Sequence, residues 1–402
     1  MTRRDGLAQA RDAIGHSQDS LAAELEVTGK TVSNWERGYS KPTRRNELQL
    51  ARILKLTHQQ VIALIEPDRE AANPAPVTFD IDPRRSQAAL LDGLRRSIIG
   101  ARGPVEESSG LDELARAVNR VHRHYQYADY EAAAKQLPKV IVQLNDQPDE
   151  PQMAAQKACA YVAGAKLATK LGCGSLAWLA ADRANHAAME SENRALVGIS
   201  RYQIACALLL NGYLDDALHL TGEALEDLAA TTTRHDQPMA TSAKGALLLL
   251  ASVMAARTGD SGNAREFLLR ARDLAESFGR EGNALWTGFG PTNVAIHELS
   301  VAVQLGDVRR SYELGSVLDT DRLPRALVGR RSQVHLDLGR AAMGAGDDGL
   351  AVLHLLEAER VAKQAVSHNA NARETIRTLL DRERRNATPG LRALAMRAGV
   401  HD

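Results

Sequence analysis

Five glycines divide most of this chain into units of nearly equal length. Gly172, Gly212, Gly259, Gly306 and Gly346 are separated by 40, 47, 47 and 40 residues. Glycine readily adopts the left-handed conformation that ends many helices, and a fixed period of this length is typical of repeat proteins. We therefore predict that residues 86–385 form an array of helical units, with one of these glycines in the turn of each unit.

The residues that follow these glycines repeat as well. Each glycine precedes a small residue by five positions, and the same step from Ala128 also reaches an alanine. These small residues are Ala133, Ala177, Ala217, Ala264, Ser311 and Ala351. A small side chain one turn into a second helix lets the two helices of a hairpin approach closely. Beyond residue 86 the apolar residues keep helical spacing without sustained alternation, so we predict an all-α fold.

One of the predicted turns carries a motif of a known repeat family. Residues 211–217 read Asn-Gly-Tyr-Leu-Asp-Asp-Ala, which resembles the Gly-x-Tyr-x-x-Ala turn of tetratricopeptide repeats. The resemblance covers about residues 111–366 and implies an α-solenoid of helical hairpins whose first helices line a concave groove. The period of 40 to 47 residues is longer than the ~34 residues of that repeat. An array of hairpins without superhelical order is the alternative.

The segments on either side of the array differ in composition. Residues 67–85 contain four prolines, each of which disfavours helix at the residue before it, so we expect a linker there. We expect residues 1–66 to form a separate compact domain. Residues 386–402 are expected to form a cap helix or a tail.

Two short helices joined by a tight turn are predicted in the first domain. Ser17 can cap a helix that begins at Gln18, and Thr28 can cap one that begins at Gly29. The residues expected to share a small core are Leu7, Ile14, Leu21, Ala22, Leu25, Val27, Val32, Trp35, Leu48, Ala51, Leu54 and Leu56. The spacing of Trp35 from Val32 favours this core over an exposed stacking platform.

These residues also resemble a family of DNA-binding domains. Ser-Gln at 17–18, Trp-Glu-Arg-Gly at 35–38 and Lys-Pro at 41–42 resemble the lambda-repressor-like helix-turn-helix family over about residues 7–65. The resemblance implies a five-helix domain whose third helix enters the major groove of a double-stranded DNA operator. It assigns base reading to Lys30, Thr31 and Asn34. The other predicted DNA contacts are Gln18, Thr28, Ser33, Arg37, Lys41, Arg44 and Arg45.

The charge of the chain supports such contacts only locally. The 50 basic residues balance 50 acidic residues, so the whole chain has no net attraction for nucleic acid. Residues 30–55, however, carry seven basic residues against two acidic ones. We expect a homodimer, because one such domain reads one half of a palindromic site, and we place the dimer contacts in the repeats. The alternative is a helix-turn-helix that packs on protein.

Equivalent positions of the repeats predict a ligand groove. The residues 13, 9 and 6 positions before the glycines lie on one helix face, and their rows are Ile199, Gln203, Cys206; Ala246, Leu250, Val253; Asn293, His297, Ser300; and Gln333, Asp337, Arg340. The first two rows are mostly apolar and the last two are polar, which suits a short peptide. Arg340, or the nearby Arg330 and Arg331, could meet a carboxylate of that ligand. The predicted ligand contacts of this face are Gln203, Asn293, His297, Gln333, Asp337 and Arg340. A solvated face without a ligand is the alternative.

A glycine-rich loop at residues 282–291 contains Trp286 and Phe289, which are predicted either to close on the ligand or to plug a repeat interface. A helix-turn-helix followed by such an array is similar in architecture to the peptide-sensing transcription regulators of Gram-positive bacteria. That resemblance implies a groove ligand, a peptide or a small molecule, that modulates DNA binding in quorum sensing. Two alternatives stay open: a protein-interaction adaptor, and an antitoxin-type regulator with a protein in the groove.

Other function classes are disfavoured by the absence of their motifs. The chain contains no GxxxxGKS, GxSxG or HExxH sequence, so we expect neither an enzyme nor a cofactor. His122 and His124 are expected to be surface or interface residues and not metal ligands. The longest apolar stretch, residues 246–256, is shorter than a membrane span. Three cysteines without a CxxC pair favour a cytoplasmic protein.

Overall fold

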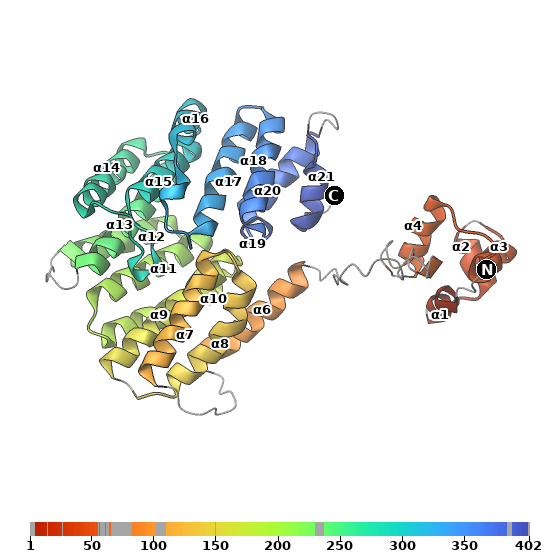
Figure 1. The fold of residues 1–402 in the computed structure, drawn as a ribbon, viewed down its shortest axis with the longest axis horizontal. Coiled ribbons are helices and arrows are strands. Elements are labelled where there is room, and N and C mark those ends of the chain that lie inside the picture. The colour runs from red at the N-terminus through yellow and green to blue at the C-terminus, as the bar shows by residue number, and fades with distance from the viewer. Residues whose placement is uncertain are drawn as a thin grey trace. The chain divides into compact units, whose positions relative to one another are not determined.

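The computed structural model describes the backbone of residues 5–13, 15–25, 27–54, 56, 61, 64–65, 83–100, 110–148, 150–229, 237–383 and 388–400. It divides into two compact units, Met1–Ile81 and Asp82–Asp402, which are treated separately below. All secondary structure in the described residues is helical, so the predicted all-α fold is correct (Figure 1). Most of the expected linker lies outside the described residues, and its last three residues begin a helix.

The first unit is a small helical domain. Its described helices are α1 (Asp5–Ala13), α2 (Gln18–Glu24), α3 (Gly29–Glu36) and α4 (Arg44–Ile53). The expected fifth helix falls on residues 57–66, most of which lie outside the described residues. The buried core contains Leu7, Leu21, Ala22, Leu25, Val32, Trp35, Leu50, Leu54, Val61 and Ile65. Trp35 is therefore a core residue, as its spacing predicted.

The second unit consists mainly of helix pairs. It begins with α6 (Pro83–Ile98), and the pairs are α7 (Leu111–Gln126) with α8 (Tyr130–Asn145), α9 (Pro151–Lys170) with α10 (Gly174–Glu190), α11 (Arg194–Leu210) with α12 (Leu214–Ala229), α13 (Gln237–Arg257) with α14 (Ser261–Phe278), α15 (Pro291–Gln304) with α16 (Val308–Val317), and α17 (Val328–Gly344) with α18 (Asp348–Val361). Short 3-10 helices, η2 (Ala284–Trp286) and η3 (Thr320–Arg322), lie between pairs. The chain ends with α19 (Lys363–Ser367), α20 (Ala370–Asp381) and α21 (Leu391–Arg397).

The predicted turns and close contacts of the pairs are both present. All five repeat glycines have positive φ angles between 74° and 87°, and Ala128 takes the same role in the first pair with a φ of 59°. All six small residues that follow at the fifth position are 0% exposed. The sequence therefore predicted the hairpins correctly, because the turn and the closest helix contact are both encoded locally.

The array also bends until its ends meet, which the repeat pattern did not predict. The backbone N–H of Glu131 donates to Oε1 of Gln364 over 3.1 Å, although the residues are 233 positions apart. The rings of Tyr130 and His368 lie 6.3 Å apart. The last helices thus contact the first pair, and the first helices of the intervening pairs surround a shared space.

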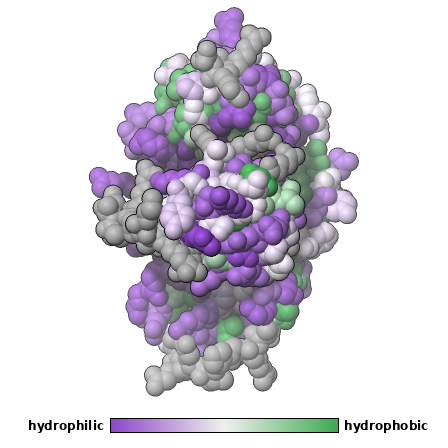
Figure 2. Space-filling model, turned by 90° about the vertical axis from the view of Figure 1, so that its right-hand side faces the viewer, coloured by the Kyte–Doolittle hydropathy of each residue, from purple (hydrophilic) through white to green (hydrophobic). Residues whose placement is uncertain are grey.

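Helix α13 corrects one expectation. Its residues 238–257 are long and apolar enough to cross a membrane by length and composition, although the apolar stretch that we identified was shorter. In the structure 72% of that window is buried against other helices, so α13 is a core helix of the array. The face in Figure 2 is mainly hydrophilic, with apolar side chains in small separate groups.

Candidate functional site

Helix α3 begins where the sequence predicted. Thr28 precedes it in an extended conformation, and its hydroxyl accepts from the backbone N–H of Thr31 over 3.2 Å. Ser17 caps α2 in the same way, accepting from the N–H of Ser20. Val32 and Trp35 turn the apolar side of α3 into the core. Caps and core together fix which side of α3 faces outward.

The outward side of α3 carries the predicted base-reading residues. We call Lys30, Thr31, Ser33 and Asn34 the reader surface; Lys30 is exposed, and the other three are half-buried. The hydroxyls of Thr28 and Thr31 lie 2.8 Å apart. At Gly29 a Cβ atom would lie 1.9 Å from Oδ1 of Asp19, so a side chain there would require the Asp19 carboxylate to move.

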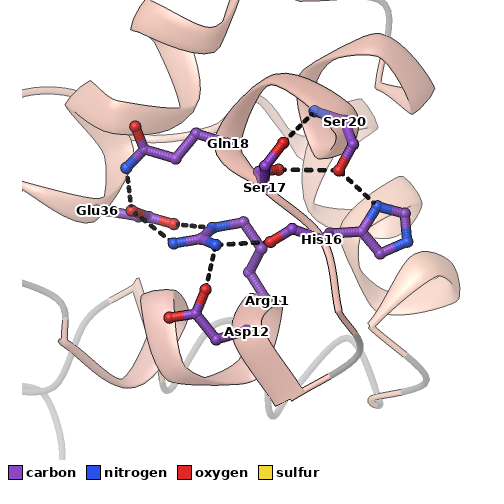
Figure 3. Close-up of polar contacts among 7 residues, drawn as sticks. All are labelled: Arg11, Asp12, His16, Ser17, Gln18, Ser20 and Glu36. Atoms are coloured by element: carbon purple, nitrogen blue, oxygen red, sulfur yellow. Dashed lines mark hydrogen bonds and ion pairs between the residues drawn. The ribbon is translucent and has the colours of Figure 1, made fainter.

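A buried polar network, which sequence reasoning missed, joins the first three helices (Figure 3). Nε of Arg11 donates to Oε1 of Glu36 over 2.7 Å, and both side chains are less than a tenth exposed. Nη1 of Arg11 also donates to the His16 carbonyl, and Nε2 of Gln18 donates to Oε2 of Glu36 over 2.6 Å. The network sets how α2 and α3 cross. Because Gln18 donates one of its N–H groups to Glu36, that group is not available for the phosphate contact that we predicted for this residue.

The predicted phosphate contacts follow α3. Arg37 and Lys41 are exposed. Arg44 and Arg45 begin α4, and their side chains lie outside the described residues. Glu36, one of the two acidic residues in this basic segment, is buried against Arg11, so its charge is compensated within the domain. The surface that follows α3 is therefore more positive than the residue count alone indicates.

A second candidate site lies inside the array. A cavity of about 570 Å³, which we call the repeat cavity, is lined by residues of α7, α8, α9, α11, α13, α15, α17 and α20 and of neighbouring loops. Its wall includes the predicted residues Gln203, Trp286, Asn293, His297 and Gln333. The apolar rows that contain Ile199 and Ala246 line it as well. The structure therefore brings most of the predicted face to one cavity of ligand size.

Three predicted ligand residues lie elsewhere. Phe289 is fully buried against α13, where a Cβ on Gly245 would lie 2.2 Å from its ring, so Phe289 is a plug and not a lid. Asp337 is buried and accepts hydrogen bonds from Ser300 and from Nε2 of Gln333. Arg340 does not line the repeat cavity. Of the last row, only Gln333 lines the cavity.

Trp286 has a different role from its neighbour in the loop. Its ring stacks on His122 with centroids 3.5 Å apart, and its carbonyl accepts from Nζ of Lys166 over 3.2 Å. Leu285 and Trp286 both have positive φ angles, 52° and 54°, a strained conformation for residues with side chains. The loop is thus held as part of the cavity wall. His122 is fully buried between α7, α9 and this loop, so of our two expectations the surface position is wrong and the interface position is correct.

His297 is held in its neutral form. Burial lowers its pKa to about 3. Its Nδ1 lies 2.8 Å from the carbonyl oxygen of Asn293. Because a carbonyl only accepts, Nδ1 carries the proton and Nε2 is left as an acceptor. The residue can therefore accept a hydrogen bond in the cavity without bringing charge to it.

Sequence reasoning missed four of the five basic residues of the cavity and considered only Arg330, as a partner for a carboxylate. Lys166 stands six residues before Gly172, in register with Cys206 and Val253, so extending the pattern by one unit would have found it. Lys170 and Arg257 each stand two residues before a repeat glycine. These two residues share one position of the repeat, but the predicted face included only the positions 13, 9 and 6 residues before each glycine. Arg330 and Arg373 come from segments without that register.

Comparisons with known proteins identify the family of the first domain. The sequence matches the helix-turn-helix family over residues 7–61. A curated relative is the HTH-type transcriptional regulator DicA of Escherichia coli (strain K12), which is 27% identical over 126 residues, covering 31% of this chain and 87% of DicA. The predicted resemblance to helix-turn-helix domains is thereby confirmed, and the first unit carries such a domain.

A solved structure matches with a much weaker likeness. PlcR of Bacillus thuringiensis, crystallised in complex with the peptide PapR7 and DNA, is 14% identical and has a TM-score of 0.32. The match covers 69% of this chain and 95% of that chain. A TM-score of this size establishes no common overall arrangement, and the properties of the repeat cavity follow from its own residues.

Proposed function

We propose that this chain is a sequence-specific, DNA-binding transcription regulator and not an enzyme. The observation that carries the proposal is the reader surface, which projects from a capped, core-anchored helix inside a confirmed helix-turn-helix domain. The likeness to DicA, itself a transcriptional regulator, supports it. We place the protein in the cytoplasm, where its operator would be.

The chemistry of the reader surface suits base edges in the major groove. The ammonium group of Lys30 can donate to guanine, and the amide of Asn34 can pair with adenine through a donor and an acceptor. Thr31 can meet a thymine methyl group. Gln18, Thr28, Ser33, Arg37, Lys41, Arg44 and Arg45 would fix the domain on the backbone, since phosphate contacts position and base contacts specify.

We further propose a homodimer on a palindromic operator, with half-sites about one helical turn, ~34 Å, apart. The second unit would supply the dimer contacts. A ligand in the repeat cavity, a peptide or a small molecule, would change the dimer and hence DNA binding. Gln203, Trp286, Asn293, His297 and Gln333 are its proposed contacts from the predicted face. Signalling between cells, as in quorum sensing, is the proposed context.

The test is fluorescence anisotropy of the full chain on fragments of its own upstream region, against scrambled DNA, at roughly 50 and 200 mM salt. We expect binding that prefers one fragment and weakens steeply with salt. Asn34→Ala should cost about 1–3 kcal/mol on that fragment alone. Arg37→Ala should weaken binding to all sequences and reduce the salt dependence.

Asn119→Ala, which alters an exposed asparagine of α7 in the second unit, is the matched control and should change nothing. Equal affinity for scrambled DNA in all variants would contradict the proposal and favour an adaptor. Binding that is specific but depends on a co-purified protein in the cavity would favour an antitoxin-type regulator.

A further inference from the structure

The repeat cavity has a one-sided charge. The described residues of its wall include five basic residues and no aspartate or glutamate. The basic residues are Lys166, Lys170, Arg257, Arg330 and Arg373. The whole chain, in contrast, has equal numbers of acidic and basic residues. A wall of one sign therefore reflects the selection of residues at this place and not the composition of the chain.

Three of these cations lack an internal counterion. Within the described part of the chain, Lys166, Lys170 and Arg330 form no salt bridge. Burial, together with the charge of Arg330, lowers the pKa of Lys166 and of Lys170 to about 8. The buried acid on α17, Asp337, is already bonded to Ser300 and Gln333. Withdrawing charge from solvent without a counterion is costly, so an anion bound beside these cations would lower the energy of the cavity.

Two neutral residues of the wall each have a buried polar atom without a hydrogen-bond partner. Gln203 and Asn293 are each 2% exposed. Nε2 of Gln203 and Oδ1 of Asn293 have no hydrogen-bond partner. One is a donor and the other an acceptor, and native proteins rarely leave either of them buried and unpaired. A ligand with an amide, or with a hydroxyl that both donates and accepts, would satisfy both.

Part of the cavity wall is apolar. Ile199 on α11 and Ala246, Leu250 and Val253 on α13 form this part of the wall. The volume of about 570 Å³ lies within the range of small-molecule sites. A purely polar ion would leave the apolar side against water.

We propose that the repeat cavity binds an anionic amphiphile: a carboxylate or phosphate group held by Lys166, Lys170 and Arg330, a central polar group against Gln203 and Asn293, and an apolar part against α11 and α13. The proposal rests on the proposed function, of which it specifies the ligand class. A short acidic peptide and an acidic lipid-like molecule share this chemistry.

The cavity also predicts a dependence on pH. The rings of Tyr125 and Tyr130 lie under the ammonium groups of Lys166 and Lys170, each 5.9 Å from centroid to nitrogen. The other titratable or charged groups that act on the two amines or are affected by them are His122, Cys159, Cys206, Arg330, Asp337 and His368. Burial raises the pKa of Cys206 to about 11 and lowers that of His122. The two lysines are thus the groups that lose charge just above pH 8.

The test uses two fluorescent probes that differ in one charge. One is 8-anilinonaphthalene-1-sulfonate, and the other is N-phenyl-1-naphthylamine, which has the same rings without the sulfonate. We expect the full chain to bind the sulfonate at one saturable site, at least about tenfold more tightly than the neutral probe. Equal affinity for both probes, or no saturable binding of the sulfonate, would overturn the proposal.

Single variants test which basic residues of the cavity bind the sulfonate group. Lys170→Met and Arg330→Gln should each weaken sulfonate binding about tenfold, or ~1.4 kcal/mol, and leave the neutral probe unchanged. Arg340→Gln, on the same helix as Arg330 but outside the cavity, is the matched control. Should a variant not fold, the wild-type chain still decides: its affinity for the sulfonate should fall between about pH 7 and 9.5 as the lysines lose protons, while the neutral probe is unaffected.

Competition distinguishes the sources of the ligand. An acetylated tetrapeptide with two acidic residues is compared with its uncharged asparagine and C-terminal amide analogue, and octyl phosphate is compared with octanol. Displacement of the sulfonate by the acidic peptide alone identifies a peptide site, and displacement by octyl phosphate alone identifies a lipid-like ligand. Equal displacement by the neutral compounds contradicts the proposal. No DNA is present, so this result and the operator experiment fail independently.

Discussion

The reader surface and the repeat cavity solve opposite problems of recognition. The reader surface consists of four residues within positions 30–34 of one short helix, on the side opposite the buried Val32. The cavity wall extends from Tyr125 to Arg373 and comes from eight helices and several loops. A site on one element is encoded by its own neighbours in sequence, whereas a site between elements depends on how all of them pack.

The two sites also treat charge differently. Beside the reader surface, the acidic Glu36 is buried in a pair with Arg11, and the basic residues Arg37 and Lys41 stay in solvent. In the cavity four of the five basic residues are themselves half-buried, and the wall carries no aspartate or glutamate among its described residues. The first arrangement stabilises the free domain. The second costs stability, which the proposed anionic ligand would restore, as expected where binding is selected over stability.

The largest effect is expected from the plug that supports the cavity. Phe289→Ala removes a fully buried ring packed on Gly245, so it should lower the free energy of unfolding of the second unit by about 3–5 kcal/mol. Circular dichroism melts of the full chain would measure it. Leu353→Ala, at an exposed position, is the control. Loss of ligand binding without a change in stability would instead restore Phe289 as a lid.

A somewhat smaller effect is expected in the first domain. Arg11→Met leaves Glu36 buried with only Gln18 as a partner, and removing one member of a buried pair should cost about 3 kcal/mol. DNA affinity should fall with it, because the network sets the crossing of α2 and α3. Arg309→Met, which breaks an exposed pair with Glu313, serves for comparison and should leave the melting curve almost unchanged. Equal costs in the two melts would mean that the network is not structural.

The smallest effect is a pH dependence that comes from the cavity alone. The folded-state pKa of Lys166 and Lys170, about 8, lies below the unfolded value of 10.5. The unfolded chain therefore binds more protons between these values, and stability rises with pH across this window and is lost as pH falls through 8. Relative to a Lys166→Met, Lys170→Met double variant, the wild type should gain on the order of 1 kcal/mol between about pH 7 and 9.5.

Melting curves of both proteins at the two pH values measure that difference, and effects of other groups cancel in the comparison. A stability difference between the two proteins that stays constant with pH would show that the two amines titrate normally. The cavity would then resemble the reader surface, whose cations stay solvated.

Residue patterns predicted the local features of both units. The helix starts at Gln18 and Gly29 follow from the hydroxyls of Ser17 and Thr28, and the hairpin turns follow from glycines that tolerate positive φ. The pattern also indicated which face of α11 and α13 lines a common cavity, because that face repeats from one unit to the next. The helix starts and the hairpin turns depend on residues within about one or two turns of each other, and the shared face depends on the repeat of the same local pattern in each unit.

Other features were beyond such patterns. Arg11 and Glu36 are 25 residues apart, and nothing local marks them as partners. The amides of Gln126 and Asn283, which hold the strained loop at Trp286 to α7, are 157 residues apart. The loop could be interpreted from sequence either as a lid or as a plug, and the structure divides the roles between Trp286 and Phe289.

Residue patterns alone predict that this chain is helical, where its hairpins turn, and which helix of the first domain presents Lys30, Thr31 and Asn34. The closure of the array, with Gln364 against Glu131, and the meeting of five cations in one cavity become visible only when the helices are packed in three dimensions. A hairpin is stabilised by contacts within one unit, whereas the curvature of the array is the sum of small rotations between units, each set by side chains from two of them.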